Sequence, residues 1–106
     1  MKKFKCIVTR VDEYEIEIDE AKINAEWMEC FRSYMYSSFT EYEDHAEHLA
    51  QLRARIGEGF YEGYGVPLVN GEVPLYGKVN KETIQDGINI RVISEDNDCE
   101  VEVEEL

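Results

Sequence analysis

The strongest constraint on the fold is a period-two alternation that runs from Phe4 to Ile18 with one interruption. Apolar side chains occupy the even positions of this stretch, and the odd positions are mostly polar. A β-strand points successive side chains to opposite faces, so the alternation predicts strand with one buried face. The apolar residues of the pattern are Phe4, Cys6, Val8, Tyr14, Ile16 and Ile18.

The alternation is interrupted at residues 10–12, which predicts a turn. A three-residue loop there would form a hairpin in which Val8 faces Tyr14 and Lys5 faces Glu17. Apolar and ionic pairs agree on this register, and a two-residue loop would place apolar faces opposite polar ones. A single long bent strand is the alternative.

The end of the chain shows the same alternation. Two strands at 88–92 and 99–103, joined through a loop at 96–97, predict a second hairpin. In that register Arg91 lies opposite Glu102.

A helix is predicted after the first strands, with Asn24 as a candidate N-cap. Apolar side chains follow at spacings of three and four and form a stripe that indicates core packing. The stripe consists of Trp27, Cys30, Phe31, Tyr34 and Met35.

A second helix is predicted to begin at the capping box of residues 40–43 and to end at Gly57. Its inward stripe is thinner than that of the first helix, so it is expected to cover an edge of the core. The expected inward residues are Tyr42, Ala46, Leu49, Arg53 and Ile56, or a rotated set that includes Leu52.

Residues 57–77 are rich in glycine and aromatic side chains, and they predict a bent loop with a short hairpin at Asn70 and Gly71. The glycines do not indicate a phosphate-binding loop, because Glu58 and Glu62 would repel a phosphate and no lysine accompanies them. The aromatic residues are expected to pack on the core, or alternatively to form an exposed patch.

These elements predict one α+β domain over residues 1–106, in ββααβββ-like order. We expect a two-layer sandwich in which an antiparallel sheet of the N-terminal and C-terminal hairpins packs on the two helices. The three cysteines, Cys6, Cys30 and Cys99, are expected to be reduced thiols buried in the core.

The formal net charge of −13 restricts the classes of partner. A charge of this sign repels phosphate backbones and anionic lipid, so direct nucleic-acid or membrane binding is disfavoured. It attracts a basic protein or a cation, or it serves solubility alone. No apolar run approaches the roughly 20 residues of a membrane helix and the first residues do not resemble a signal peptide, so we expect a cytoplasmic protein.

Two histidines three residues apart, His45 and His48, share a helix face and are the candidate metal ligands. Neither a zincin motif nor a di-iron motif accompanies them. A solvated helix face explains them better, and no cofactor is expected. A small metal-dependent or acid-base enzyme centred on these histidines remains the alternative function.

Acidic residues repeat at every second position on one early strand and on the last one, opposite the apolar side chains. Carboxylates two apart on a strand are spaced about 6.8 Å apart, and such rows resemble the charge of a nucleic-acid backbone. A polar outer sheet face that is simply in contact with water also explains these acidic rows. The candidate partner-binding residues are Asp96, Asp98, Glu100, Glu102 and Glu104, with Glu13, Glu15 and Glu17 beside them if the hairpins adjoin.

The sequence therefore favours a small acidic, non-enzymatic interaction protein that binds a basic partner. One form of this hypothesis is a DNA-mimic inhibitor of a nucleic-acid-binding protein, comparable in size and charge with the anti-CRISPR proteins of phages. Besides the enzyme, the alternative is a mobile-element domain without autonomous activity, for which a homo-oligomer through exposed aromatic residues is one form.

Overall fold

The structure is a computed structural model that describes residues 1–74, 81–96 and 100–106. It confirms the α+β class and the predicted order of strands and helices. In chain order the elements are β1 (Phe4–Thr9), β2 (Glu13–Ile18), α1 (Ala25–Tyr34), α2 (Tyr42–Ile56), β3 (Val66–Val69), a 3-10 turn η1 (Lys81–Thr83), β4 (Ile84–Ser94) and β5 (Glu100–Glu105).

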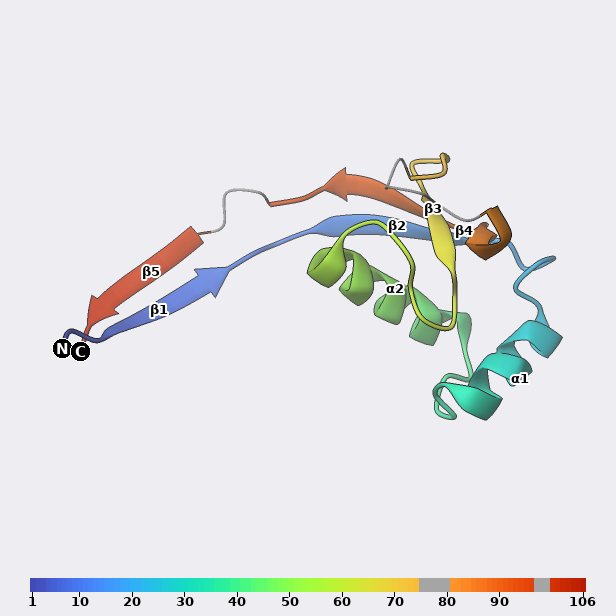
Figure 1. Cartoon of the computed structure of the whole chain (residues 1–106), viewed down its shortest axis with the longest axis horizontal. Helices are drawn as coiled ribbons and strands as arrows, with labels where there is room; N and C mark the ends of the chain where they lie inside the picture. The colour runs from blue at the N-terminus through green and yellow to red at the C-terminus, as the bar shows by residue number, and fades with distance from the viewer. Residues whose placement is uncertain (75–80, 97–99) are drawn as a thin grey trace.

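The pairing of the strands differs from both predicted hairpins. β1 pairs with β5, and β2 pairs with β4, both antiparallel, so neither β1 and β2 nor β4 and β5 are partners. In Figure 1, β1 continues in the direction of β2, and β4 is followed in the same way by β5. The N-terminal strands thus correspond to the alternative of one long interrupted strand.

The reason for the error is that a hairpin and a continuous strand have the same alternation of side chains. The ionic complementarity is preserved with other partners: Lys5 lies opposite Glu104, and Arg91 lies opposite Glu15 instead of Glu102. The segment between β1 and β2 is tied across to the opposite strand, because the backbone N–H of Asp96 donates to the Asp12 carboxylate at 2.9 Å.

A mixed sheet in the order β2-β4-β3 forms the centre of the fold, since β3 pairs with β4 in parallel. The expected sheet was purely antiparallel, and this was wrong because β3, which precedes the turn predicted at Asn70 and Gly71, pairs in parallel with β4. The predicted turn at Asn70 and Gly71 is confirmed. Both residues have positive φ, 52° and 81°, and Val69 and Glu72 exchange two backbone hydrogen bonds across it.

The helices begin and end close to the predicted residues. Asn24 caps α1 by accepting a hydrogen bond from the Trp27 N–H at 2.9 Å. The capping box of α2 lies one residue later than predicted, because Glu41 and Asp44 form it. Gly57, with φ of 73°, ends α2 as expected.

One face of the mixed sheet packs on the helices, with α2 close beneath β2 and β4 in Figure 1. The core gathers residues from both helices, from the sheet and from the loop after α2. Its buried hydrophobic side chains are Ile23, Met28, Phe31, Leu49, Tyr61, Tyr64, Ile88 and Ile90.

Some expected core residues are exposed. Cys6 and Cys30 are exposed, which contradicts the expectation of buried thiols, and Cys99 lies outside the described residues. Tyr34 and Ile56 are also exposed, and each is the last residue of its helix. Spacing along a helix gives a face, but it does not say how far along the helix the core reaches.

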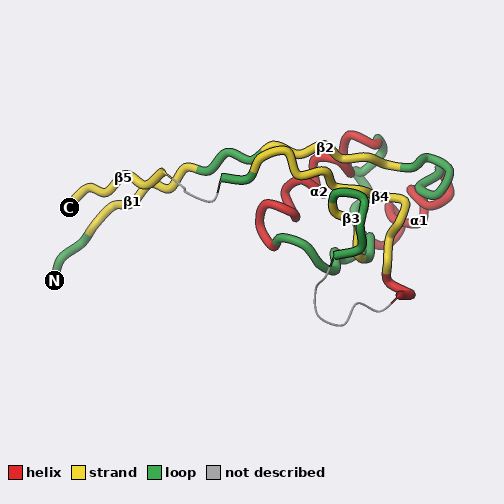
Figure 2. Tube along the Cα trace, turned by 90° about the horizontal axis from the view of Figure 1, so that it is seen from above, coloured by secondary structure: helices red, strands yellow, loops and turns green. Residues whose placement is uncertain are grey.

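The pair of β1 and β5 extends away from this core and carries both ends of the described chain (Figures 1 and 2). The molecule measures 55 × 31 × 24 Å, and its radius of gyration is 17.0 Å. A compact domain of this length would have a radius of gyration of about 13 Å. We call β1 and β5 together the ribbon and the remainder the body. Within the described ranges, no helix is long and apolar enough to cross a membrane.

Candidate interaction surface

The ribbon is exposed along its whole length. Every residue of β1 and β5 is exposed, whereas β4 contributes Ile88 and Ile90 to the core. A two-stranded antiparallel ribbon alone is at best marginally stable in water, and no described element packs over this one. The ribbon therefore adds surface rather than core to the protein.

One face of the ribbon is apolar except for Glu105, which lies opposite Phe4 at its outer end. Because β1 and β5 are in register, the even residues of β1 share a face with the odd residues of β5. Phe4, Val8, Val101 and Val103 on this face are between 51% and 62% exposed. Cys6, opposite Val103, lies in the middle of the face and is exposed as well.

The opposite face of the ribbon is acidic. Glu100, Glu102 and Glu104 lie opposite Thr9, Ile7 and Lys5 respectively. A shallow hollow of about 160 Å³ lies on the ribbon. Its lining consists of Lys5, Ile7, Glu102, Val103 and Glu104.

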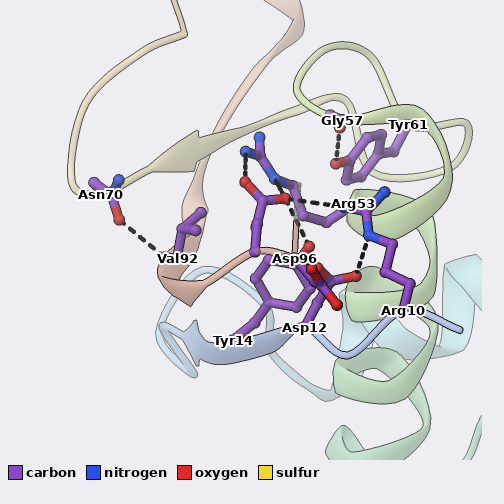
Figure 3. A network of polar contacts seen from close by, with 10 residues as sticks. Arg10, Asp12, Tyr14, Arg53, Gly57, Tyr61, Asn70, Val92 and Asp96 are labelled. Carbon is purple, nitrogen blue, oxygen red and sulfur yellow. Dashed lines mark hydrogen bonds and ion pairs between the residues drawn. The ribbon is translucent and has the colours of Figure 1, made fainter. Parts of the chain in front are cut away.

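A network of polar contacts joins the ribbon to the body (Figure 3). Arg53 of α2 donates two hydrogen bonds to the carboxylate of Glu95, at 2.9 and 3.3 Å. Tyr14 donates to the same carboxylate at 2.7 Å. Arg10 pairs with Asp12 at 2.7 Å and approaches Glu95 at 3.8 Å. We call these five residues the clamp, because they connect the segment that follows β1 and the residue that follows β4, at the root of the ribbon, to α2.

The clamp is built for structure rather than for proton transfer. The hydrogen bonds from Arg53 hold the pKa of Glu95 below its ordinary value, so this carboxylate stays charged. Burial, together with the hydrogen bond to Glu95, raises the pKa of Tyr14 to about 12. Both groups are therefore fixed in one protonation state near neutral pH, and a general acid or base requires a group that changes its state there.

The carboxylates of β2 belong to the body. Glu15 forms an ion pair with Arg91 at 3.0 Å, and Glu17 accepts a hydrogen bond from Asn89 at 2.7 Å. Glu13 lies at the start of β2, opposite Ser94. These carboxylates and those of β5 are in different sheets, so they do not form the adjoining rows that paired hairpins would have produced.

The two remaining predicted contact residues lie near the junction of β4 and β5. Asp96 is at the root of the ribbon, where its backbone N–H contacts Asp12. Asp98 lies outside the described residues. The residues that the structure places on the ribbon are therefore Glu100, Glu102 and Glu104.

The histidines occupy a different environment from the predicted solvated face. His45 is only 1% exposed, and its Nδ1 lies 2.9 Å from the hydroxyl of Tyr64. Aromatic rings of Trp27, Phe31 and Phe39 surround it. The prediction was wrong because a thin apolar stripe left the orientation of α2 undetermined, and the tertiary structure turns His45 inward.

Burial lowers the pKa of both His45 and His48. Among the residues that the structure describes, no group of three or more His, Cys, Asp or Glu side chains is arranged to bind a metal ion. The environment of His45 is that of a neutral core histidine paired with a tyrosine.

Sequence reasoning missed the clamp, although one signal for it was present. Arg53 fell within the predicted inward stripe of α2, and a charged side chain on an inward face needs a partner of opposite charge. Nothing local identified Glu95 as that partner, since 42 residues separate the two. The register of β4 against β2 decides which carboxylate reaches Arg53.

Comparison of the chain with models of protein families, with curated proteins and with solved structures finds no match.

Proposed function

We propose that this chain is a non-enzymatic interaction protein that binds a basic partner through the acidic face of the ribbon. The observation that carries the proposal is the ribbon itself, an exposed two-stranded extension that contributes no buried residue to the core. Its acidic face displays Glu100, Glu102 and Glu104, all exposed.

Charge supports a basic partner. Twenty-four acidic residues against eleven basic ones surround the whole protein with a negative field, which accelerates encounter with positive surfaces. Lys5 is the cation in register with this row, opposite Glu104, and the other two carboxylates face Thr9 and Ile7. A lysine or arginine from a partner would find its carboxylate acceptors here without displacing an internal ion pair of the body.

Nucleic-acid-binding proteins are the partner class that we propose. Their basic grooves are shaped for a row of negative charges, and carboxylates at every second residue of β5 repeat at about 6.8 Å, close to the spacing of phosphates along a nucleic-acid strand. Binding would then occlude the groove, and the chain would act as an inhibitor of the DNA-mimic type.

A charge-matched pair of variants tests this proposal. In one, Glu100, Glu102 and Glu104 are changed to Gln; in the other, Glu29, Glu47 and Glu62, which are exposed on the body, are changed to Gln. Each variant has a net charge of −10, three units less negative than −13. Any difference between them therefore reports the place of the charges and not their sum.

Binding is measured against an immobilised panel of purified basic nucleic-acid-binding proteins, with acidic proteins as the negative set. We expect retention of the unchanged chain at about 50 mM salt, loss at about 300 mM, and competition by duplex DNA. The ribbon variant should bind at least roughly tenfold more weakly than the body variant. Equal binding of the two variants, or no retention of the unchanged chain, would refute the proposal.

A further inference from the structure

The apolar face of the ribbon is not explained by an acidic interaction surface. Exposed apolar patches of this kind usually mark a contact with another protein. Phe4, Val8, Val101 and Val103 are all more than half exposed, and none of the described elements covers them. The clamp fixes the root of the ribbon to α2, so the protein does not fold this face back onto its own core.

The distribution of charge indicates what covers the face. Residues 1–10 contain four basic and no acidic side chains, and residues 100–106 contain four acidic and no basic ones, so these two terminal segments together are neutral. The whole charge of −13 lies in residues 11–99. A basic partner is attracted to the body or to the row of carboxylates on β5, but it gains little at the neutral apolar face.

A second copy of the chain, unlike a basic partner, is repelled by the acidic body and is expected to bind at the apolar face. Two copies repel each other through their bodies, and they approach with least repulsion through the ends formed by residues 1–10 and 100–106, which together are neutral. If the ribbons pack in an antiparallel fashion about a two-fold axis, the two charged bodies lie at opposite ends of the pair. The apolar face is self-complementary in this arrangement, since each copy presents the same valines and Phe4, and Glu105 at the outer end of the face has Lys2 of its own chain as an ion-pair partner at 3.8 Å.

We therefore propose that the occupant of the apolar ribbon face is a second copy of this chain, and that the ribbons pack face to face in a symmetric dimer. The acidic faces then point outward on both sides of the pair, so the dimer leaves Glu100, Glu102 and Glu104 accessible. Dimerisation and partner binding use opposite faces of the ribbon, and each is testable without the other.

The size of the face predicts the strength of the dimer. Two strands of six residues present a surface roughly 20 Å long and 10 Å wide. This is smaller than the about 800 Å² per partner of a standard stable interface. The dimer should accordingly dissociate on dilution, with a dissociation constant on the order of micromolar or weaker.

Sedimentation of the purified chain between about 1 µM and about 500 µM tests the proposal. We expect a concentration-dependent shift from monomer to dimer. Changing both Val8 and Val101 to Thr, which preserves strand propensity and shape, should raise the dissociation constant at least tenfold. The matched control is Ile7→Thr, because this residue is the neighbour of Val8 on the opposite face.

A chemical probe gives an independent readout. Cys6 lies within the apolar ribbon face, whereas Cys30 lies exposed on α1, so Cys30 is an internal control for alkylation by a maleimide in a variant whose third thiol is removed by Cys99→Ser. At high protein concentration Cys6 should react several-fold more slowly than at low concentration, and Cys30 should react at an unchanged rate. Circular dichroism establishes that the variants keep the folded body.

A chain that stays monomeric over the whole range, or a Cys6 rate that does not change with concentration, would overturn the proposal and leave the face for a different protein. The three Glu→Gln changes on β5 should leave sedimentation unaffected. Failure of the dimer and failure of basic-partner binding are thereby distinguishable.

Discussion

The guanidinium of Arg53 on α2 forms a two-point ion pair with the carboxylate of Glu95, which follows the end of β4. The two side chains are 12% and 21% exposed, so water screens this pair much less than the surface ion pairs of the protein. The same carboxylate accepts the hydroxyl of Tyr14. One residue thus joins the helix layer to the strands from which the ribbon projects.

The clamp leads to a first prediction. Glu95→Gln removes the charge but retains the shape, and it leaves Arg53 with a weaker partner in a mostly buried place. We expect a loss of about 1–3 kcal/mol in the free energy of unfolding, as for a hydrogen bond to a charged group. Urea denaturation at neutral pH measures it.

The control for this prediction is Asp86→Asn. Asp86 pairs with Lys22 at 2.9 Å, and both side chains are at least half exposed, so little or no change is expected there. A loss for Glu95→Gln no larger than that of the control would contradict the role given to the clamp.

A second prediction concerns acid. Burial lowers the pKa of His45 and His48 in the folded protein, so between that value and about 6.5 the unfolded chain binds more protons than the folded one. The free energy of unfolding that the neutral histidines contribute is fully present above pH about 6.5. It is lost as the pH falls through the pKa of the histidines in the folded protein. The reference pKa of a carboxyl group in a model peptide is about 4, which lies below this range.

Urea midpoints measured from pH about 7.5 to about 5 check this sign. The midpoint should decrease below pH about 6.5 in the unchanged chain. In a variant with both histidines replaced by Gln, the curve should be flatter over the same range, whatever its absolute stability. Parallel curves for the two proteins would contradict the prediction.

A third prediction compares two glycines with positive φ. Gly65, with φ of 97°, lies where a Cβ would stand 2.4 Å from the carbonyl oxygen of Thr83. Gly71, with φ of 81°, has open space around the same position. Gly71→Ala should lose about 1–3 kcal/mol for backbone strain. Gly65→Ala should lose more, because a backbone carbonyl has to move as well.

The unfavourable φ is common to both variants. The difference between their losses in the free energy of unfolding therefore measures the steric clash at Gly65 alone. Thermal or urea unfolding measures it. Equal losses would mean that the parallel pairing of β3 with β4 relaxes freely around Gly65.

A fourth prediction concerns local stability. At concentrations where the chain is monomeric, backbone amides of β1 and β5 should exchange with solvent orders of magnitude faster than those of β2 and β4, because the ribbon is held by one strand pair without a core. Hydrogen exchange followed by mass spectrometry measures both sets in one sample. Equal protection of ribbon and body would contradict the description of the ribbon as a separate, weakly stabilised extension.

The sequence by itself determined the α+β class, the order of the elements and most of their bounds. Each of these rests on local chemistry: alternation for the strands, the side chain of Asn24 as a cap, and the φ permitted at Gly57 and at Asn70 with Gly71. Such signals act within a few residues of the chain, so they can be seen without knowing the fold.

The tertiary structure decided which strands pair. An alternation with period two is the same for a hairpin and for a continued strand, and Lys5 and Arg91 find acidic partners in either arrangement. Pairing β1 with β5 and β2 with β4 therefore depends on contacts across the whole chain. The same contacts turned His45 into the core and brought Glu95 to Arg53.

The candidate interaction surface was also determined partly by the sequence and partly by the tertiary structure. The row of Glu100, Glu102 and Glu104 was visible in the sequence, because a strand places alternate residues on one face. That the opposite, apolar face stays uncovered was not visible, since alternation predicts that such a face exists but not that anything packs on it. Only the arrangement of the body, whose helices cover β2 and β4 and end short of β1 and β5, leaves that face uncovered among the described residues.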